Sequence, residues 1–230
     1  MARRLIRDLS SVLILSGLLL VLDAGVTLVW QEPVTAAIGL VMRGEVNQRY
    51  LSYHTAPLST TDVHALQDIQ TLNQRIAYLA RRERSQVSNG DAIGQIEIPR
   101  HGNTYNVVQG TDDVNLEEGP GHYPSTAFPG MGQTVAIAGH RTTYLAPFRF
   151  LNELRPGDRI VVTMPYGRFT YTVQYLRIVQ PSDIAVINDV GYERLVLSAC
   201  NPLYSAAQRL IVFARLMSVR PLGPARSPGA

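Results

Sequence analysis

LVLSAC, residues 195–200, is an apolar run of the kind that forms a buried β-strand, and it ends in the only cysteine of the 230-residue chain. A further apolar run starts just after Arg209, and another, residues 134–138, is followed directly by Gly139 and His140. If residues 194–199 and 210–219 are antiparallel neighbours, Cys200 and Arg209 lie on the same edge of the sheet. His140 reaches that edge if its own strand runs in the matching direction. The sequence therefore predicts a thiol, an imidazole and a guanidinium at three strand ends.

Short apolar runs separated by turn residues fill the chain from about residue 91 onward. The expected strands are residues 93–98, 105–109, 134–138, 159–164, 168–178, 184–186, 194–199 and 210–219. About eight strands with little helix are typical of a closed or sandwiched antiparallel sheet. This region is thus predicted to be a mainly β domain, an antiparallel barrel or sandwich.

Residues 9–30 form a predominantly apolar stretch near the N-terminus. About 20 such residues suffice to cross the hydrocarbon core of a bilayer. Arg3, Arg4 and Arg7 precede the stretch and Trp30 ends it, which favours a membrane helix with a cytoplasmic N-terminus. A cleaved signal peptide is the alternative, but its apolar core is usually shorter. We expect a retained single-pass anchor in the cell membrane, with the rest of the chain outside the cytoplasm.

A helical stalk is expected between the anchor and the β domain. Glu32 and Pro33 break the membrane helix, because proline removes a hydrogen-bond donor. Residues 34–50 look helical, and a second helix is expected over residues 59–84. The predicted division is an anchor over residues 1–30, a stalk over 31–90, a β domain over 91–219 and a disordered tail over 220–230.

Composition excludes several classes of function. The net charge of +3 comes entirely from arginine, and no basic stripe with interleaved aromatic residues is present, so nucleic acid is not expected as a partner. One cysteine cannot form an internal disulfide. Histidine and carboxylate spacings match no metal site, and we read Asp112, Asp113, Glu117 and Glu118 as a solvated loop. No cofactor is expected.

Thiol acyl transfer is the chemistry that these three groups can perform together. A Cys200 thiolate attacks a carbonyl and forms a thioester, and the guanidinium of Arg209 stabilises the negative oxygen. His140 protonates the departing amine. Each residue taken alone is more often structural. Their combination at three strand ends favours a catalytic site.

Several motifs of the chain resemble those of sortases, in particular the class E sortases of actinobacteria. The motifs are GPGHYP at residues 119–124, AGHRTTY at 138–144, CNP at 200–202 and QRLIV at 208–212. The resemblance covers residues 94–217. It implies an eight-stranded β-barrel and a cysteine transpeptidase that cleaves LPXTG-like or LAXTG-like sorting signals of secreted proteins between Thr and Gly. The acceptor it implies is an amine of a peptidoglycan precursor.

The resemblance also implies roles for individual residues. Cys200 corresponds to the nucleophile, His140 to the general acid and base, and Arg209 to the group that stabilises the oxyanion or substrate. A substrate-binding set is expected from Tyr144, Thr142, Ser198 and Ala199. Ala199 departs from the family, which commonly has threonine before the nucleophile.

Three other functions stay open at this point. The same scaffold could hydrolyse the thioester with water, or bind sorting signals without turnover. A pilus-polymerising sortase is the third, although neither a lid motif nor a second span is evident in the sequence. An L,D-transpeptidase is less consistent, because its cysteine usually follows glycine.

Overall fold

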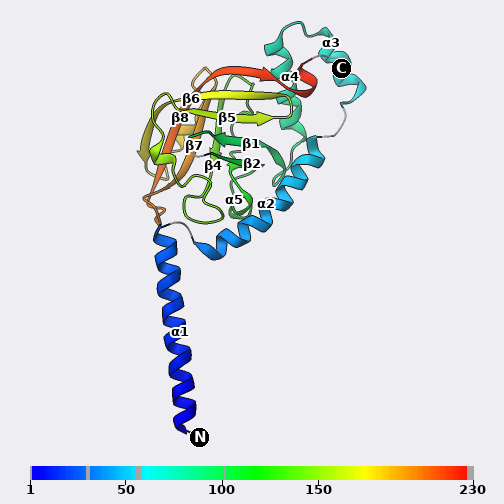
Figure 1. Ribbon diagram of the computed structural model, residues 1–230. Helices are drawn as coiled ribbons and strands as arrows, with labels where there is room; N and C mark the ends of the chain where they lie inside the picture. Colours follow the sequence, from blue (N-terminus) through cyan, green and yellow to red (C-terminus); the bar gives the residue numbers. More distant parts are fainter. Residues whose placement is uncertain (1, 30–31, 55–57, 101, 227–230) are drawn as a thin grey trace.

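A closed eight-stranded β-barrel forms the body of the protein (Figure 1). The computed structural model describes residues 2–29, 32–54, 58–100 and 102–226. The strands are β1 Ala92–Ile98, β2 Asn103–Gln109, β3 Gly121–His122, β4 Thr134–Ala138, β5 Arg159–Met164, β6 Gly167–Val179, β7 Arg194–Asn201 and β8 Gln208–Pro221. Around the barrel they follow the order β1-β2-β3-β4-β7-β8-β6-β5. The predicted barrel is confirmed.

The barrel is largely antiparallel, with two parallel contacts. β2 pairs with β3 and β4 pairs with β7 in parallel, whereas the other six pairs are antiparallel. The connection from β4 to β7 includes the β5–β6 hairpin, which closes the far side of the barrel. Because β4 and β7 run in the same direction, their C-terminal ends meet at one edge.

One expected strand is wrong, and one observed strand was missed. Residues 184–186 form part of a 3-10 helix, η2 Ile184–Ile187, rather than a strand. A short apolar run cannot be assigned to helix or strand from periodicity alone, and here no neighbouring strand pairs with it. The two-residue strand β3 was not predicted, because so short a segment carries no alternation.

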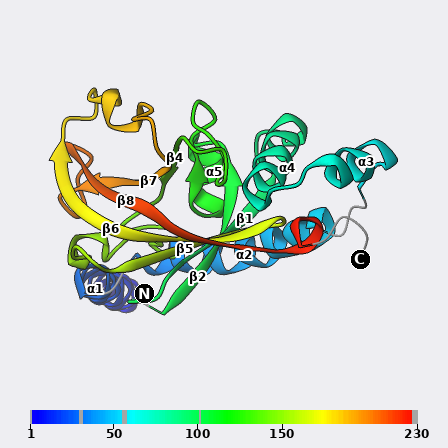
Figure 2. The ribbon, with the colours of Figure 1, turned by 90° about the horizontal axis from the view of Figure 1, so that it is seen from above.

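Five α-helices accompany the barrel among the described residues. They are α1 Ala2–Val29, α2 Pro33–His54, α3 Thr60–Asp68, α4 Leu72–Gln86 and α5 Asp113–Glu118, with further 3-10 turns η1 Leu151–Glu153 and η3 Gly223–Ala225. The expected helix over residues 34–50 is confirmed and is longer than predicted. The single helix expected over residues 59–84 is wrong: Ile69 is extended and Thr71 caps a new helix with its side chain. Figure 2 shows α3 and α4 beside one end of the barrel.

α1 projects from the barrel as an isolated helix (Figure 1). Its apolar part spans Ile6–Leu28, a length and composition that suit a membrane crossing, and none of that window is buried against the rest of the protein. Trp30, expected at the interface, lies outside the described residues. Pro33 begins α2, as expected for the residue that ends one helix and opens the next.

The chain end is more ordered than expected. Residues 220–230 were predicted to be a disordered tail, but β8 continues to Pro221 and η3 follows it. Ala225 is buried against the barrel core. Residues 227–230 lie outside the described part of the chain.

Alternation along β7 separates the barrel interior from an outer groove. Leu195, Leu197 and Ala199 belong to the interior core. Val196 packs in a second, smaller cluster on the outer side, together with Phe213 of β8. Successive side chains of a strand point to opposite faces, so Ser198 and Cys200 share the outer face with Val196.

We expect Gly139→Ala to destabilise the barrel. A Cβ at this position would lie 2.6–2.9 Å from ring atoms of Phe148, which is buried. Overpacking of this kind costs about 1–3 kcal/mol of unfolding free energy. Thermal unfolding, followed by circular dichroism, should show a lower Tm.

Gly44→Ala is the matched control, because nothing lies within 4 Å of a Cβ at this position in α2. It should leave Tm unchanged or raise it, since alanine is favoured over glycine in helices by about 0.5–1 kcal/mol. Equal Tm values for the two variants would contradict the close packing of Gly139 against Phe148.

Candidate active site

Strand register places Cys200 and Arg209 side by side. In the antiparallel pairing of β7 and β8, Cys200 is directly opposite Arg209, and Ser198 is opposite Ile211. Directly opposed residues project from the same face of a sheet, with Cβ atoms about 4.5–5.5 Å apart. The thiol and the guanidinium therefore share the outer face at one edge of the barrel.

His140 reaches the same edge through the parallel pairing of β4 with β7. Ala136 is paired with Val196 and Ala138 with Ser198. The register continues one residue further, because the Gly139 N–H donates to the Ser198 carbonyl oxygen over 3.0 Å. Continued two-residue alternation past this bond places His140 at the end of the edge that carries Cys200. The register thus brings the strand ends that carry the three residues to one side of the barrel.

Arg141 connects the turn that contains His140 to the end of β7, the strand that contains Cys200. Its Nη1 donates to the Cys200 carbonyl oxygen and to Asn201 Oδ1, both at 3.1 Å. Its Nη2 donates to Asn152 Oδ1 over 2.7 Å, and the residue is only 4% exposed. Burial lowers the pKa of Arg141 from its usual value, yet a guanidinium stays charged at any physiological pH. Arg141 is a structural clamp with a charge close to the thiol.

The imidazole of His140 lies next to the ring of Tyr144 and near the carboxylates of Glu117 and Asp113. The ring centroids of His140 and Tyr144 are 5.4 Å apart, and the Tyr144 hydroxyl donates to Glu117 Oε1 over 2.9 Å. Burial lowers the pKa of His140, and the negative charges of Glu117 and Asp113 oppose that shift. The two acidic residues of α5 therefore help the ring to hold a proton.

Arg209 stands at the mouth of a groove on the outer side of the barrel. Its Nη1 donates to the Ala206 and Gln208 carbonyl oxygens over 2.9 and 3.0 Å, which holds the guanidinium at the edge. The groove is lined by Arg209, Ser198 and Tyr123 together with η2 and the segment before it. Of the residues that line the groove, Arg209 is the one directly opposite Cys200 in the strand pair.

The residues expected to bind substrate are placed in different surroundings. Ser198 lines the groove. Tyr144 and Thr142 lie in the turn after His140, where the Thr142 carbonyl oxygen accepts a hydrogen bond from the Glu32 N–H. Ala199 is 3% exposed and packs in the barrel core, opposite Leu210. Its methyl group is on the face away from Cys200. The Ala199 side chain therefore faces the core and is not available to contact a substrate in the groove.

The turn after His140 has unusual backbone geometry. Tyr144, Leu145 and Ala146 all have positive φ, at 49°, 65° and 43°. Non-glycine residues rarely adopt the left-handed region, and the strain must be offset by surrounding contacts. α2 supplies such contacts, because the Tyr144 N–H donates to Thr35 Oγ1 over 3.3 Å.

Two functional neighbours of His140 were not identified from the sequence. Glu117 was read as part of a solvated loop, but it sits in α5, far along the chain from His140. Arg141 follows His140 directly, and an arginine after a strand end is more often a surface charge. No periodic signal in the sequence distinguishes either residue.

His122 has a structural rather than a chemical environment. It is 1% exposed and its ring nitrogens contact Gln109 Oε1 and the Ala127 carbonyl oxygen, both at 2.9 Å. Burial lowers its pKa to about 4, so the ring is neutral at physiological pH. His122 therefore braces the barrel wall through buried hydrogen bonds.

Comparison with known proteins identifies the fold and family that the sequence motifs resemble. The family model described as the sortase domain matches residues 96–217. Sortase D of Bacillus subtilis is 34% identical in an alignment of length 130 that covers 55% of this chain and 64% of the relative. Sortase SrtE1 of Streptomyces coelicolor is 30% identical in an alignment of length 148 that covers 57% of this chain and 42% of the relative. The chain thus spans less than two thirds of either of these relatives.

A solved structure aligns with nearly its full length. The crystal structure of sortase E1 from Streptomyces coelicolor, with a tripeptide in its active site, aligns with a TM-score of 0.56 and 28% identity. The alignment covers 61% of this chain and 94% of that one. The aligned share of this chain is large enough to include most of the barrel.

We expect Glu117→Gln to lower the pKa of His140. The substitution removes a negative charge that favours the imidazolium, so a larger fraction of His140 is neutral at any pH near its pKa. The shift should be downward, as measured by NMR titration of the ring protons.

Glu118→Gln serves as the control, because it makes the same charge change on α5 but pairs with Arg49 at the surface. Its effect on His140 should be smaller. A His140 pKa that rises in Glu117→Gln, or that moves equally in both variants, would show that Glu117 does not support the proton.

Proposed function

The chain belongs to the sortase family, and on that basis we propose that it is a membrane-anchored cysteine transpeptidase. Its donor is a sorting signal of the LPXTG or LAXTG type on a secreted protein, cut between Thr and Gly. Its acceptor is an amine of a peptidoglycan precursor. The observation that supports the proposal is the strand register, which sets Cys200 opposite Arg209 and brings the end of β4, just before His140, to the same edge.

The first half-reaction forms a thioester at Cys200. The thiolate attacks the threonine carbonyl carbon, and the tetrahedral oxygen gains a negative charge. Arg209 faces the thiol across the strand pair, so its N–H groups are placed to donate to this oxygen. The His140 imidazolium gives its proton to the glycine nitrogen, which leaves as a neutral amine.

The second half-reaction reverses these roles. The incoming amine loses a proton to the neutral imidazole of His140 and attacks the thioester carbonyl carbon. A new amide bond forms and the thiolate leaves. The thioester conserves the energy of the original peptide bond, so no nucleotide is needed outside the cytoplasm.

The outer groove supports a peptide donor. It lies beside Arg209, and Ser198 forms part of its wall two residues before the nucleophile. A structural neighbour, sortase E1 of Streptomyces coelicolor, carries a tripeptide in its active site. An extended segment of the sorting signal in this groove would present its threonine carbonyl group to Cys200.

The membrane location is supported by α1. Its apolar window is long enough to cross a bilayer and is not buried against the barrel. Arg3, Arg4 and Arg7 at its start favour a cytoplasmic N-terminus, with the barrel on the opposite side. The motifs after His140 favour class E within the family.

Incubation with a labelled LAXTG peptide tests the proposal. Intact-mass spectrometry should show the peptide acyl group on Cys200, and the adduct should be absent in Cys200→Ala. An added primary amine should convert the adduct into an amide product. Hydrolysis alone, even with excess amine, would favour a hydrolase, and saturable binding without an adduct would favour a binding protein.

A matched pair of arginine variants tests the oxyanion role in the same assay. Arg209→Ala should lower kcat by about 100- to 1,000-fold, the range found for loss of an oxyanion donor. Arg215→Ala removes an arginine of the same strand that instead packs on Tyr192, and it should have little effect on kcat. Equal kcat values for the two variants would remove Arg209 from the mechanism.

A further inference from the structure

An exposed apolar stripe runs along the first part of α2. Val34, Ile38 and Val41 are 62%, 42% and 67% exposed, and their spacing places them on one face of the helix. The same face continues with Glu45 and Gln48, which are exposed and polar. The stripe is therefore apolar only in the part of α2 that lies next to α1.

The opposite face of α2 is fixed on the barrel. Val46 is 1% exposed and packs with Ala92 and Val108 of the barrel wall. Gly39 lies so close to the Tyr144 backbone that a Cβ would be 3.2–3.3 Å from it. α2 cannot rotate to bury its apolar stripe without losing these contacts.

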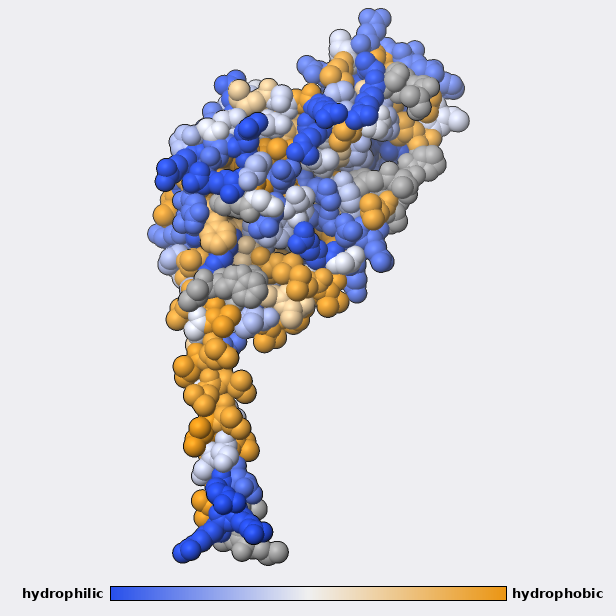
Figure 3. Space-filling model, in the orientation of Figure 1, coloured by the Kyte–Doolittle hydropathy of each residue, from blue (hydrophilic) through white to orange (hydrophobic). Residues whose placement is uncertain are grey.

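The stripe is continuous with the proposed membrane anchor. α1 ends at Val29 and α2 begins at Pro33, so few residues separate the two helices. Figure 3 shows hydrophobic surface that continues from α1 onto the body of the molecule where α2 begins. In Figure 1, α2 rises away from the end of α1, so its polar part is farther from that helix.

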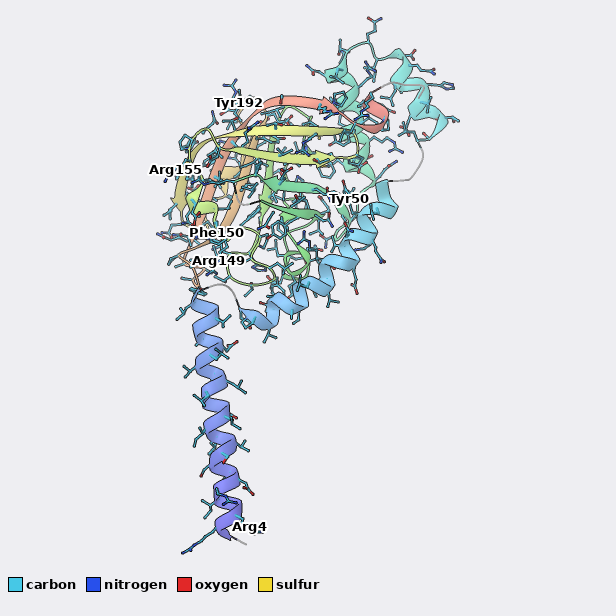
Figure 4. The ribbon with its side chains drawn as sticks, in the orientation of Figure 1. Arg4, Tyr50, Arg149, Phe150, Arg155 and Tyr192 are labelled. Atoms are coloured by element: carbon cyan, nitrogen blue, oxygen red, sulfur yellow. The ribbon has the colours of Figure 1, made fainter. Side chains whose placement is uncertain are left out.

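The edge of the barrel that carries Cys200 lies on the same side of the molecule as the end of α1. Tyr204, in the loop between Cys200 and Arg209, donates from its hydroxyl to the carbonyl oxygens of Thr27 and Leu28 at the end of α1. Figure 4 shows Phe150 and Arg149 on the barrel side close to this end of α1, and Arg4 at the opposite end. The edge that carries Cys200 therefore lies next to the point where α1 leaves the membrane.

We propose that Val34, Ile38 and Val41 insert into the interface of the phospholipid bilayer, and that α1 and α2 together hold the Cys200 edge at the membrane surface. The proposal rests on the membrane anchoring proposed above and does not depend on transpeptidation. Helices of this kind lie with the apolar face roughly 5–10 Å into the headgroup boundary. The change from apolar to polar along the stripe matches a helix that enters the interface at its start and leaves it obliquely.

Docking in the interface also braces the histidine turn. α2 contacts that turn through Thr35 and the Tyr144 N–H, and Glu32 donates to the Thr142 carbonyl oxygen. A helix that is held by lipid on one face and by the barrel on the other keeps these contacts in place. The strained residues after His140 then have a rigid support on the side that faces the bilayer.

Depth-dependent fluorescence quenching tests the proposal with the full chain. Cys200→Ser removes the only thiol, and single cysteines are then introduced as Ile38→Cys, Val41→Cys, Gln48→Cys and Leu15→Cys. Each is labelled with an environment-sensitive fluorophore in vesicles of phosphatidylcholine and phosphatidylglycerol. Lipids that carry a nitroxide just below the headgroup should quench positions 38 and 41 by about twofold or more, and position 48 only weakly.

The label at position 15 separates this proposal from the anchoring itself. Quenching at 15 by deeply placed nitroxides, without quenching at 38 and 41, would overturn the interfacial docking and leave the anchor intact. Absence of quenching at 15 would overturn both. A blue-shifted but unquenched label at 38 would indicate a second protein surface over the stripe, and would also overturn the proposal.

Ile38→Ser/Val41→Ser tests whether the stripe sets the position of the cysteine edge. A label on Leu203→Cys, in the loop after Cys200, should lose about half or more of its quenching by shallow nitroxides in this background. Glu45→Ser/Gln48→Ser is the control on the same face and should preserve it. Equal quenching of the label at 203 in both backgrounds would show that α2 does not orient the barrel.

Discussion

The register of three strands is the constraint on which the site depends. Parallel pairing of β4 with β7 brings the turn that holds His140 to the end of β7, and antiparallel pairing of β7 with β8 aligns Cys200 with Arg209. A slip of one residue in β7 would turn Cys200 into the barrel interior and Ala199 out into the groove. The leucines of β7 prevent such a slip, because it would move them from the core to the outer face.

Hydrogen bonds from Arg141 further stabilise the register of β4 and β7. Arg141 joins the turn after β4 to the end of β7 and to Asn152, and it does so from a buried position. Breaking one side of a buried charged network leaves the other groups without partners, which is costly. The histidine therefore has a fixed place although it lies in a turn whose following residues are strained.

The site is open because it lies on the outside of the barrel. The interior is filled by one large apolar core, and the edge that carries Cys200 has its own small cluster around Val196 and Phe213. A polypeptide can approach the groove without any opening of the core. The acidic residues of α5 and the ring of Tyr144 then shape the environment of His140 from the other side.

Strand ends and the apolar N-terminal helix could be predicted from the sequence because their signals are local. Residues 134–138 and 159–164 were assigned with the observed bounds, and Cys200, His140 and Arg209 were brought together by two assumptions, one about strand pairing and one about strand direction. Glu117 and the break at Ile69 could not be found in this way. The first depends on contacts between distant segments, and the second interrupts an apolar spacing that continues on both sides of it.

The most direct measurement of the central claim is the rate at which iodoacetamide alkylates Cys200 as a function of pH. This rate follows the thiolate, and a neighbouring imidazolium favours the thiolate. If the strand register places the two side chains together, the wild-type profile has two inflections, and His140→Ala leaves only one. Superimposable profiles for the wild type and His140→Ala would show that thiol and imidazole are not coupled, and would contradict the account.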